Sequence, residues 1–186
     1  MRNFFNSRSE HQTGDESSVD RPPERIDRLL VPESVLQQTI FGLALGGTRE
    51  MLCYWLGAAL SNTPTGVNSA VVTTVAFPKI LSSYDHFEVV EGQMGLITQW
   101  CADRGFWVLA QVHSHPTDEP HSVADETWPA SHRVGFLSVI FPFFAQLSSV
   151  QNPNWRVYES MGHGRWEQIQ PEGRLEIVQG NWLPPR

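Results

Sequence analysis

Two histidines and an aspartate lie close together at the end of an apolar run. His113 and His115 follow the run 106–112, and Asp125 comes ten residues after His115. Alternate residues of a β-strand point to the same side, so both imidazoles are expected to project together from the strand end. Two imidazoles and one carboxylate leave the fourth tetrahedral position of zinc open, as in catalytic sites. The segment therefore predicts a catalytic Zn²⁺ site, in which the ion acidifies a water molecule and polarises a carbonyl.

Ser122 stands three residues before Asp125, which is the spacing of a helix capping box. That spacing alone needs no metal, and the histidine pair is what points to one. In the metal-site interpretation Ser122 caps the helix and donates a hydrogen bond to the developing oxyanion. Three roles stay open for His121: an exposed loop histidine, which we favour, a residue that supports the ligands, or a substitute ligand.

Three other metal-binding motifs match this sequence less well. A cupin site would use His113, His115 and Glu119, but the glycines and the later Pro-x-x-His of cupins are missing. A metallo-β-lactamase site needs His-x-His-x-Asp-His, and two residues stand between His115 and Asp118. A zinc deaminase needs Pro-Cys-x-x-Cys, which this chain lacks.

The elements that position these residues are read from hydrophobic periodicity and from Gly and Pro. The order of these elements predicts the α/β class: a single layered domain with a mixed β-sheet flanked by helices. We assign this domain to residues 25–186, after a flexible polar tail at 1–24. Helices are expected from Pro32-Glu33 to Gly46-Gly47, over 93–102, and from 122 to about 132, the last weakened by Pro129. Strands are expected at 50–58, 67–77, 87–90, 106–112 and 134–141, with a hairpin of 155–160 and 165–170 and a last strand at 174–178.

Composition narrows the function classes. Hydrophobic residues make up 40% and charged residues 18%, and the formal net charge is −7. This balance is typical of a globular protein and counts against a general nucleic-acid binder. No apolar run reaches the about 18 residues of a membrane span, and the first residues lack the pattern of a signal peptide. Cys53 and Cys101 lie in apolar stretches and are expected to be buried free thiols, consistent with the cytoplasm.

The motif resembles the signature of the JAMM (MPN-plus) zinc metalloproteases. In that family His-x-His-Pro is followed by a loop and Ser-x-x-Asp, and a glutamate stands far upstream. Glu50 matches that glutamate here, after the first predicted helix and at the start of a core strand. The resemblance covers Glu50 to about Phe144 and implies a cytidine-deaminase-like layered fold. It also implies that Glu50 acts as general base and then acid on the attacking water. The alternative for Glu50 is a surface charge.

One departure from the family pattern concerns the loop before Ser122. Six residues, 116–121, separate His115 from Ser122, where the family usually has seven. A loop can absorb one deletion, but the position of the Ser122 hydroxyl depends on it.

The resemblance implies a substrate class. JAMM proteins with all ligands are typically peptidases that cut after the C-terminal glycine of ubiquitin or a ubiquitin-like protein. This small domain resembles bacterial (Prok-JAB) members that are encoded beside ubiquitin-like proteins and their activating and conjugating enzymes, some of them in antiphage defence. It is therefore expected to be a deubiquitinase-like isopeptidase that processes a precursor, removes the modifier from a lysine, or both. The tail would bind as an added strand, contacted by 78–95 and 145–165. Trp128 is expected to be a packed aromatic, with the groove wall as its alternative.

Three alternatives remain. The substrate could be a sulfur carrier or another peptide. The chain could be a non-catalytic MPN-like scaffold, although such scaffolds usually lose ligands that are all present here. It could also be a RadC-like DNA-repair accessory, but those chains carry His-Asn-His-Pro-Ser-Gly, whereas Ser114 and Thr117 stand in this sequence.

Overall fold

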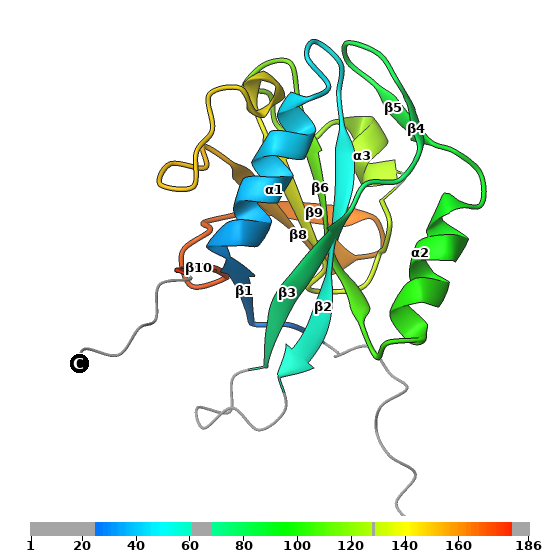
Figure 1. Ribbon diagram of the computed structural model, residues 1–186, viewed down its shortest axis with the longest axis vertical. Coiled ribbons are helices and arrows are strands. Elements are labelled where there is room, and N and C mark those ends of the chain that lie inside the picture. The colour runs from blue at the N-terminus through cyan, green and yellow to red at the C-terminus, as the bar shows by residue number, and fades with distance from the viewer. Residues whose placement is uncertain (1–24, 61–67, 128, 180–186) are drawn as a thin grey trace, which may run out of the picture.

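The computed structural model describes residues 25–60, 68–127 and 129–179. Its centre is an eight-stranded sheet with the strand order β10-β1-β3-β2-β6-β7-β8-β9 (Figure 1). The strands of this sheet are β1 Arg28–Pro32, β2 Leu52–Leu60, β3 Ser69–Ala76, β6 Trp107–Ser114, β7 Leu137–Phe141, β8 Arg156–Gly162, β9 Arg165–Ile169 and β10 Leu175–Val178. The other elements are the helices α1 Glu33–Ala44, α2 Gln93–Ala102 and α3 Val123–Thr127, the 3-10 turn η2 Phe143–Ala145, and a separate hairpin of β4 Ile80–Ser82 and β5 Phe87–Val89.

The sheet is mixed. β1 runs parallel to β3 and β10, and β6 runs parallel to β7, whereas the other neighbours are antiparallel. The predicted α/β class, a single layered domain with a mixed sheet flanked by helices, is thereby confirmed.

Helices α1 and α2 cover opposite faces of the sheet, as alternate residues of β2 demonstrate. Trp55 packs in the larger apolar cluster, which includes Leu36 of α1. Tyr54 packs in the smaller one with Cys101 of α2. Because β2 is covered on both faces, its sequence is a nearly continuous apolar run instead of an alternating one.

A buried hydrogen-bond chain fastens α1 to β2. The indole Nε1 of Trp55 donates to Thr39 Oγ1 at 2.8 Å, and the Thr39 hydroxyl donates to the carbonyl oxygen of Val35 at 2.9 Å. Both side chains are fully buried, so these bonds remove the cost of unpaired polar groups. The chain then leaves α1 through Gly47, whose φ of +67° favours glycine, as predicted for this helix end.

Several predicted elements differ from the structure. The helix expected over 122–132 is α3 and ends at Thr127; Pro129 removes a backbone donor and disfavours helical geometry just before it. The strand expected from residue 50 begins at Leu52, because the Glu50 N–H bonds to Ser83 of the β4–β5 hairpin. The expected strand at 87–90 is β5 of that hairpin. The sequence missed β1 and β4 altogether.

Two predictions concern residues that the structure does not describe. The tail at 1–24 and Trp128 are outside the described residues. Within the described part, no helix combines the length and apolar character of a membrane span.

Candidate metal centre

Parallel pairing of β6 and β7 creates the platform for the site. His113 lies opposite Ile140 and Ser114 opposite Phe141, so both strands end at the same edge of the sheet. The backbone of His115 is then held from two sides: its N–H donates to Phe141 O at 3.0 Å, and its carbonyl accepts from Phe144 N at 2.8 Å. His115, which follows β6, is therefore held by backbone hydrogen bonds although it lies outside the strand.

The turn that donates a hydrogen bond to the His115 carbonyl has an unusual backbone. Phe143, Phe144 and Ala145 have φ angles of 54°, 54° and 60°, in the left-handed region that side chains other than glycine rarely adopt. Such conformations persist where surrounding contacts determine them. Here those contacts include the Phe144–His115 hydrogen bond.

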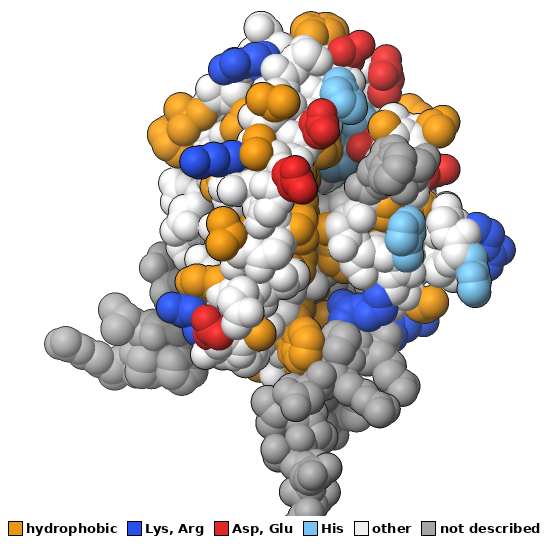
Figure 2. Space-filling model, turned by 90° about the vertical axis from the view of Figure 1, so that its right-hand side faces the viewer, with side chains coloured by type: hydrophobic (Ala, Val, Ile, Leu, Met, Phe, Trp, Pro, Cys, Tyr) orange, Lys and Arg blue, Asp and Glu red, His pale blue; other side chains and the backbone are white. Residues whose placement is uncertain are grey.

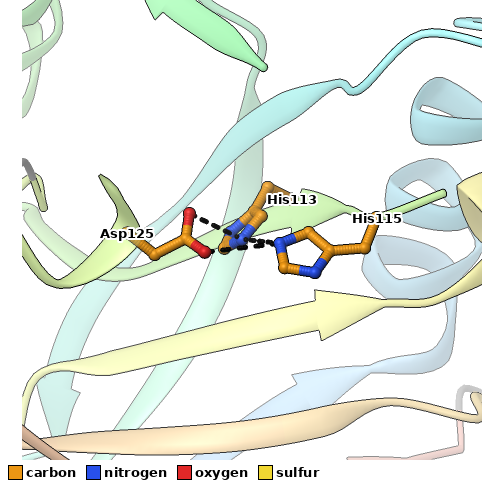
Figure 3. A group of neighbouring side chains, drawn as sticks. All are labelled: His113, His115 and Asp125. Carbon is orange, nitrogen blue, oxygen red and sulfur yellow. Dashed lines mark hydrogen bonds and ion pairs between the residues drawn. The ribbon is translucent and has the colours of Figure 1, made fainter. Parts of the chain in front are cut away.

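The three predicted metal ligands come together (Figure 3). His113 Nε2 and His115 Nε2 are 3.1 Å apart, His113 Nε2 is 3.1 Å from Asp125 Oδ1, and His115 Nε2 is 3.3 Å from Asp125 Oδ2. Ligand atoms of a tetrahedral zinc site with bonds of about 2.0–2.1 Å lie about 3.3 Å apart, so the spacing fits zinc. These three residues could hold a metal ion; that they bind zinc stays a prediction.

The chemistry of the donor atoms also fits a cation. Two imidazole nitrogens and a carboxylate face one another, and all three side chains are at least nine-tenths buried. Their lone pairs repel unless a proton or a metal ion lies among them. The pKa of Asp125 is lowered below its ordinary value, because the two histidines and the Ser122 N–H outweigh the effect of burial. Burial lowers the pKa of His115, but its contacts with Asp125 and Glu50 raise it overall.

A reciprocal cap holds the carboxylate ligand. The Ser122 N–H donates to Asp125 Oδ2 at 2.8 Å, and the Asp125 N–H donates to Ser122 Oγ at 3.2 Å. The capping box is therefore present, and it holds Asp125 where its carboxylate could also bind a metal ion. Because the Ser122 oxygen acts as the acceptor, its O–H is left to donate, and this exposed side chain lines the cleft described next.

A cleft of about 560 Å³ opens beside the three ligands. Figure 2 shows this side of the molecule, with acidic side chains gathered around a histidine above an apolar hollow. Apolar lining is supplied by β2, β5 and Pro116, and carboxylates by five residues. The described lining contains no lysine or arginine. The acidic lining residues are Glu50, Asp85, Glu88, Glu119 and Asp125.

Glu50 faces the same cleft as the ligands. Its side chain is only 6% exposed, and no hydrogen bond or ion pair reaches its carboxylate within the described structure. Burial, the main cause, raises the pKa of Glu50 to about 7, with smaller contributions from Asp125, Asp85 and Glu119 against the opposing effect of His115. Glu50 is therefore not the surface charge that was its alternative, and it is poised between its two protonation states near neutral pH.

His121 is not the exposed loop histidine that we favoured. It is 9% exposed, its ring stacks on Tyr158 with centroids 4.6 Å apart, and its Nε2 lies 3.1 Å from Ser138 Oγ. The sequence also gave no role to Gln111, whose side chain bonds to Ser138. A polar residue amid the apolar run 106–112 was the available signal.

The predicted substrate-contacting regions divide clearly. Residues 85–89 of the first region line the cleft, whereas no residue of 145–165 is among the described lining. The β4–β5 hairpin therefore forms one wall of the cleft through its turn and β5, and the Phe87 ring centroid lies 5.5 Å from that of His113.

Comparisons with known proteins add to this geometry. No protein-family model matches the chain. A 47-residue segment is 40% identical to the probable metalloprotease y4jG of Sinorhizobium fredii, covering 25% of this chain and 29% of that protein. The chain thus matches less than a third of that relative's length.

Two solved structures resemble the chain. The solution structure of protein DSY2949 from Desulfitobacterium hafniense has a TM-score of 0.61 at 14% identity, covering 81% of this chain and 93% of that one. At that identity the likeness shows a shared fold alone. AF2198, a JAB1/MPN domain protein from Archaeoglobus fulgidus, has a TM-score of 0.47 at 17% identity, covering 80% of this chain and 97% of that one. A score of that size does not by itself establish a shared fold.

Proposed function

We propose that this chain is a zinc-dependent peptidase with a JAMM/MPN metalloprotease-like fold. The 47-residue match to a probable metalloprotease supports this assignment. One observation carries the proposal. Three buried ligand atoms from two segments converge within 4.8 Å of one another, at the edge of a cleft that also holds a buried, unpaired carboxylate. A non-catalytic scaffold needs neither the ligand set nor Glu50.

The residues divide the work of amide hydrolysis. A zinc ion held by His113, His115 and Asp125 would supply Lewis-acid polarisation of the carbonyl and a reactive water. Glu50 takes the proton that this water loses as its oxygen bonds to the carbonyl carbon, and then gives it to the leaving amine as the C–N bond breaks. A carboxyl group whose pKa is about 7 can do both near neutral pH. The Ser122 hydroxyl donates to the carbonyl oxygen as negative charge develops there.

The substrate we propose is the glycine-ended tail of a ubiquitin-like protein, cut as a precursor or as an isopeptide conjugate on a lysine. The wall formed by β5 supports this choice, because β5 pairs with β4 on one edge only, within the described residues. An extended tail can therefore join β5 as an added strand beside the ligands. A small glycine suits a scissile bond that must approach buried ligand atoms closely.

The proposal also covers the cellular location and the partner proteins. We place the protein in the cytoplasm of a bacterium, in a ubiquitin-like system with activating-like and conjugating-like enzymes. Cys53 and Cys101 support a reducing compartment, because both are buried and free.

The metal content of the purified protein tests the proposal first. We expect near one zinc per chain in the wild type and loss of zinc in His115→Ala, measured by elemental analysis. Fusions of ubiquitin-like proteins to a reporter are then tested for cleavage after the terminal glycine, by mass spectrometry. Wild-type protein that binds no zinc even after its addition would contradict the proposed function and favour a scaffold.

A further inference from the structure

His121 is the centre of a packed group behind the ligands. Its ring lies between the β8–β9 hairpin and β7: it stacks on Tyr158 at an interplanar angle of 13°, its centroid is 5.0 Å from that of Trp166, and its Nε2 is 3.1 Å from Ser138 Oγ. Ser138 is fully buried. The loop before α3 thus sends one side chain inward, onto three strands, β7, β8 and β9.

Gln111 completes the group from β6. Its Nε2 donates to Ser138 Oγ at 3.1 Å, and its Oε1 accepts from the Ala130 N–H at 2.9 Å. Through Ser138 it reaches His121, and directly it reaches Ala130. One buried glutamine therefore fixes both ends of the segment 121–130, which contains α3.

The fixed segment carries the anionic ligand. Ser122, next to His121, donates its N–H to Asp125 Oδ2 at 2.8 Å, and the two Asp125 oxygens lie 3.1 Å and 3.3 Å from the Nε2 atoms of His113 and His115. The position of His121 is thus passed to the carboxylate through a single peptide unit and one hydrogen bond.

We propose that the Gln111–Ser138–His121 network is a positioning device for the metal centre. It clamps the segment 121–130 to β6 and β7 and so sets the place of Asp125 and Ser122. His121 acts through Ser122 and is not itself a metal ligand. The network also accounts for the short loop of six residues, since an inward histidine draws the chain towards the sheet just before Ser122.

The geometry separates this role from metal binding. The Nε2 of His121 is directed to Ser138, and its ring centroid is 6.3 Å from that of His113. Burial lowers the pKa of His121 to about 4, so the ring is neutral at pH 7 and has one donor and one acceptor nitrogen. A neutral imidazole can bond to a buried hydroxyl without an uncompensated charge.

The test uses variants of the full chain that distinguish the contribution of the His121 ring from that of its hydrogen bond to Ser138. His121→Phe keeps an aromatic ring against Tyr158 and loses the bond to Ser138. His121→Gln keeps a hydrogen-bonding group and loses the ring, and Ser138→Ala breaks the network at its middle. His132→Phe, the same exchange at an exposed histidine, is the matched control. The zinc dissociation constant is measured by competition with a chelating indicator, and the visible spectrum of the Co²⁺-loaded protein reports on ligand geometry.

We expect His121→Phe and Ser138→Ala to weaken zinc binding by about 10–100-fold and to change the Co²⁺ spectrum, as for other residues that orient ligands. His121→Gln recovers much of the affinity, and His132→Phe matches the wild type. Wild-type affinity and spectrum in Ser138→Ala, or in a folded His121→Phe, would overturn the proposal, even where thermal stability falls. So would complete loss of zinc in His121→Phe with normal binding in Ser138→Ala, which would make His121 a ligand.

Failure of the proposed function, on which this inference rests, can be distinguished from failure of the inference itself. Wild-type protein that binds no zinc rejects the metal centre before any variant is compared. If His121→Phe does not fold, His121→Gln and Ser138→Ala still decide: the proposal requires Ser138→Ala to weaken zinc binding.

Discussion

The two walls of the cleft are built differently. On one side, β6, β7 and α3 hold three ligands that are at most 8% exposed and tied by backbone and side-chain hydrogen bonds. On the other, the β4–β5 hairpin has strands of three residues each and a two-stranded sheet of its own. Near the site it is attached by the Glu50 N–H bond to Ser83 O at 2.8 Å, by two ring contacts, and by its apolar side chains, which pack against the smaller apolar cluster.

This difference suggests that one wall carries out the reaction and that the other selects the substrate. Ligand atoms must hold their places to a fraction of an ångström, which a buried sheet edge allows. A short hairpin with exposed charged residues can differ between proteins without moving those atoms. We therefore expect changes on the ligand wall to abolish activity, and changes on the hairpin wall to alter which substrate is preferred.

The largest effect is expected at the anionic ligand. Asp125→Ala removes the only carboxylate of the ligand set, so zinc occupancy and activity should both fall, with activity reduced by about 10³-fold or more. Elemental analysis and cleavage assays measure the two. Glu126→Ala, one residue further along α3, is the control and should retain zinc. Unchanged zinc occupancy in Asp125→Ala would mean that the ligand set is wrong.

Glu50 should separate binding from chemistry. Glu50→Gln keeps the shape of the side chain and removes its ability to take a proton. Zinc content should match the wild type, while kcat falls about 10²–10⁴-fold, the usual contribution of a general acid–base group. Steady-state kinetics with a cleavable fusion measure this. Full activity in Glu50→Gln would exclude the proton-transfer role.

The raised pKa of Glu50 also predicts how the stability of the metal-free protein depends on pH. Between its ordinary value of 4.5 and about 7, the folded state holds a proton on Glu50 that the unfolded state has released. The contribution is fully present below pH 4.5 and is lost as pH rises towards 7. Relative to Glu50→Gln, wild-type protein in chelator should lose about 1–3 kcal/mol of unfolding free energy across this window. Parallel curves for both proteins, from denaturant titrations, would contradict the burial of this acid.

The smallest effect is expected on the hairpin wall. Glu88 is exposed and lines the cleft, where no lysine or arginine offsets its charge within the described lining. Glu88→Gln should raise KM about 2–5-fold for tails with arginine or lysine near the scissile bond, leave kcat unchanged, and lose this effect at high salt. Neutral tails provide the control. Equal KM values for basic and neutral tails in wild type and variant would exclude charge-based selection at this wall.

Local patterns predicted much of the fold and of the candidate site. The period of two at a strand end predicted that His113 and His115 project together, and the Ser122–Asp125 spacing predicted the cap. These relations involve residues at most three apart, where backbone geometry alone sets the direction of side chains. The order of the main helices and strands followed from the same short-range periodicity.

The features that were missed depend on contacts between distant residues. Strand β1 exists because Leu29 pairs with Ala70 on one side and with Leu175 on the other, and five residues carry no strand signal strong enough to predict this. The inward direction of His121 depends on Ser138 and Tyr158, which lie in strands further along the chain.

By itself, the sequence determined the types and spacing of the candidate ligands and the strand end that presents them, because bonded geometry relates neighbouring residues directly. Only the tertiary structure decided that Glu50 is a buried acid in the same cleft, that His121 faces the core, and that one cleft wall belongs to the large sheet and the other to a separate hairpin. Burial and desolvation arise from segments that meet in space, and these set the pKa of Glu50 and the neutrality of His121.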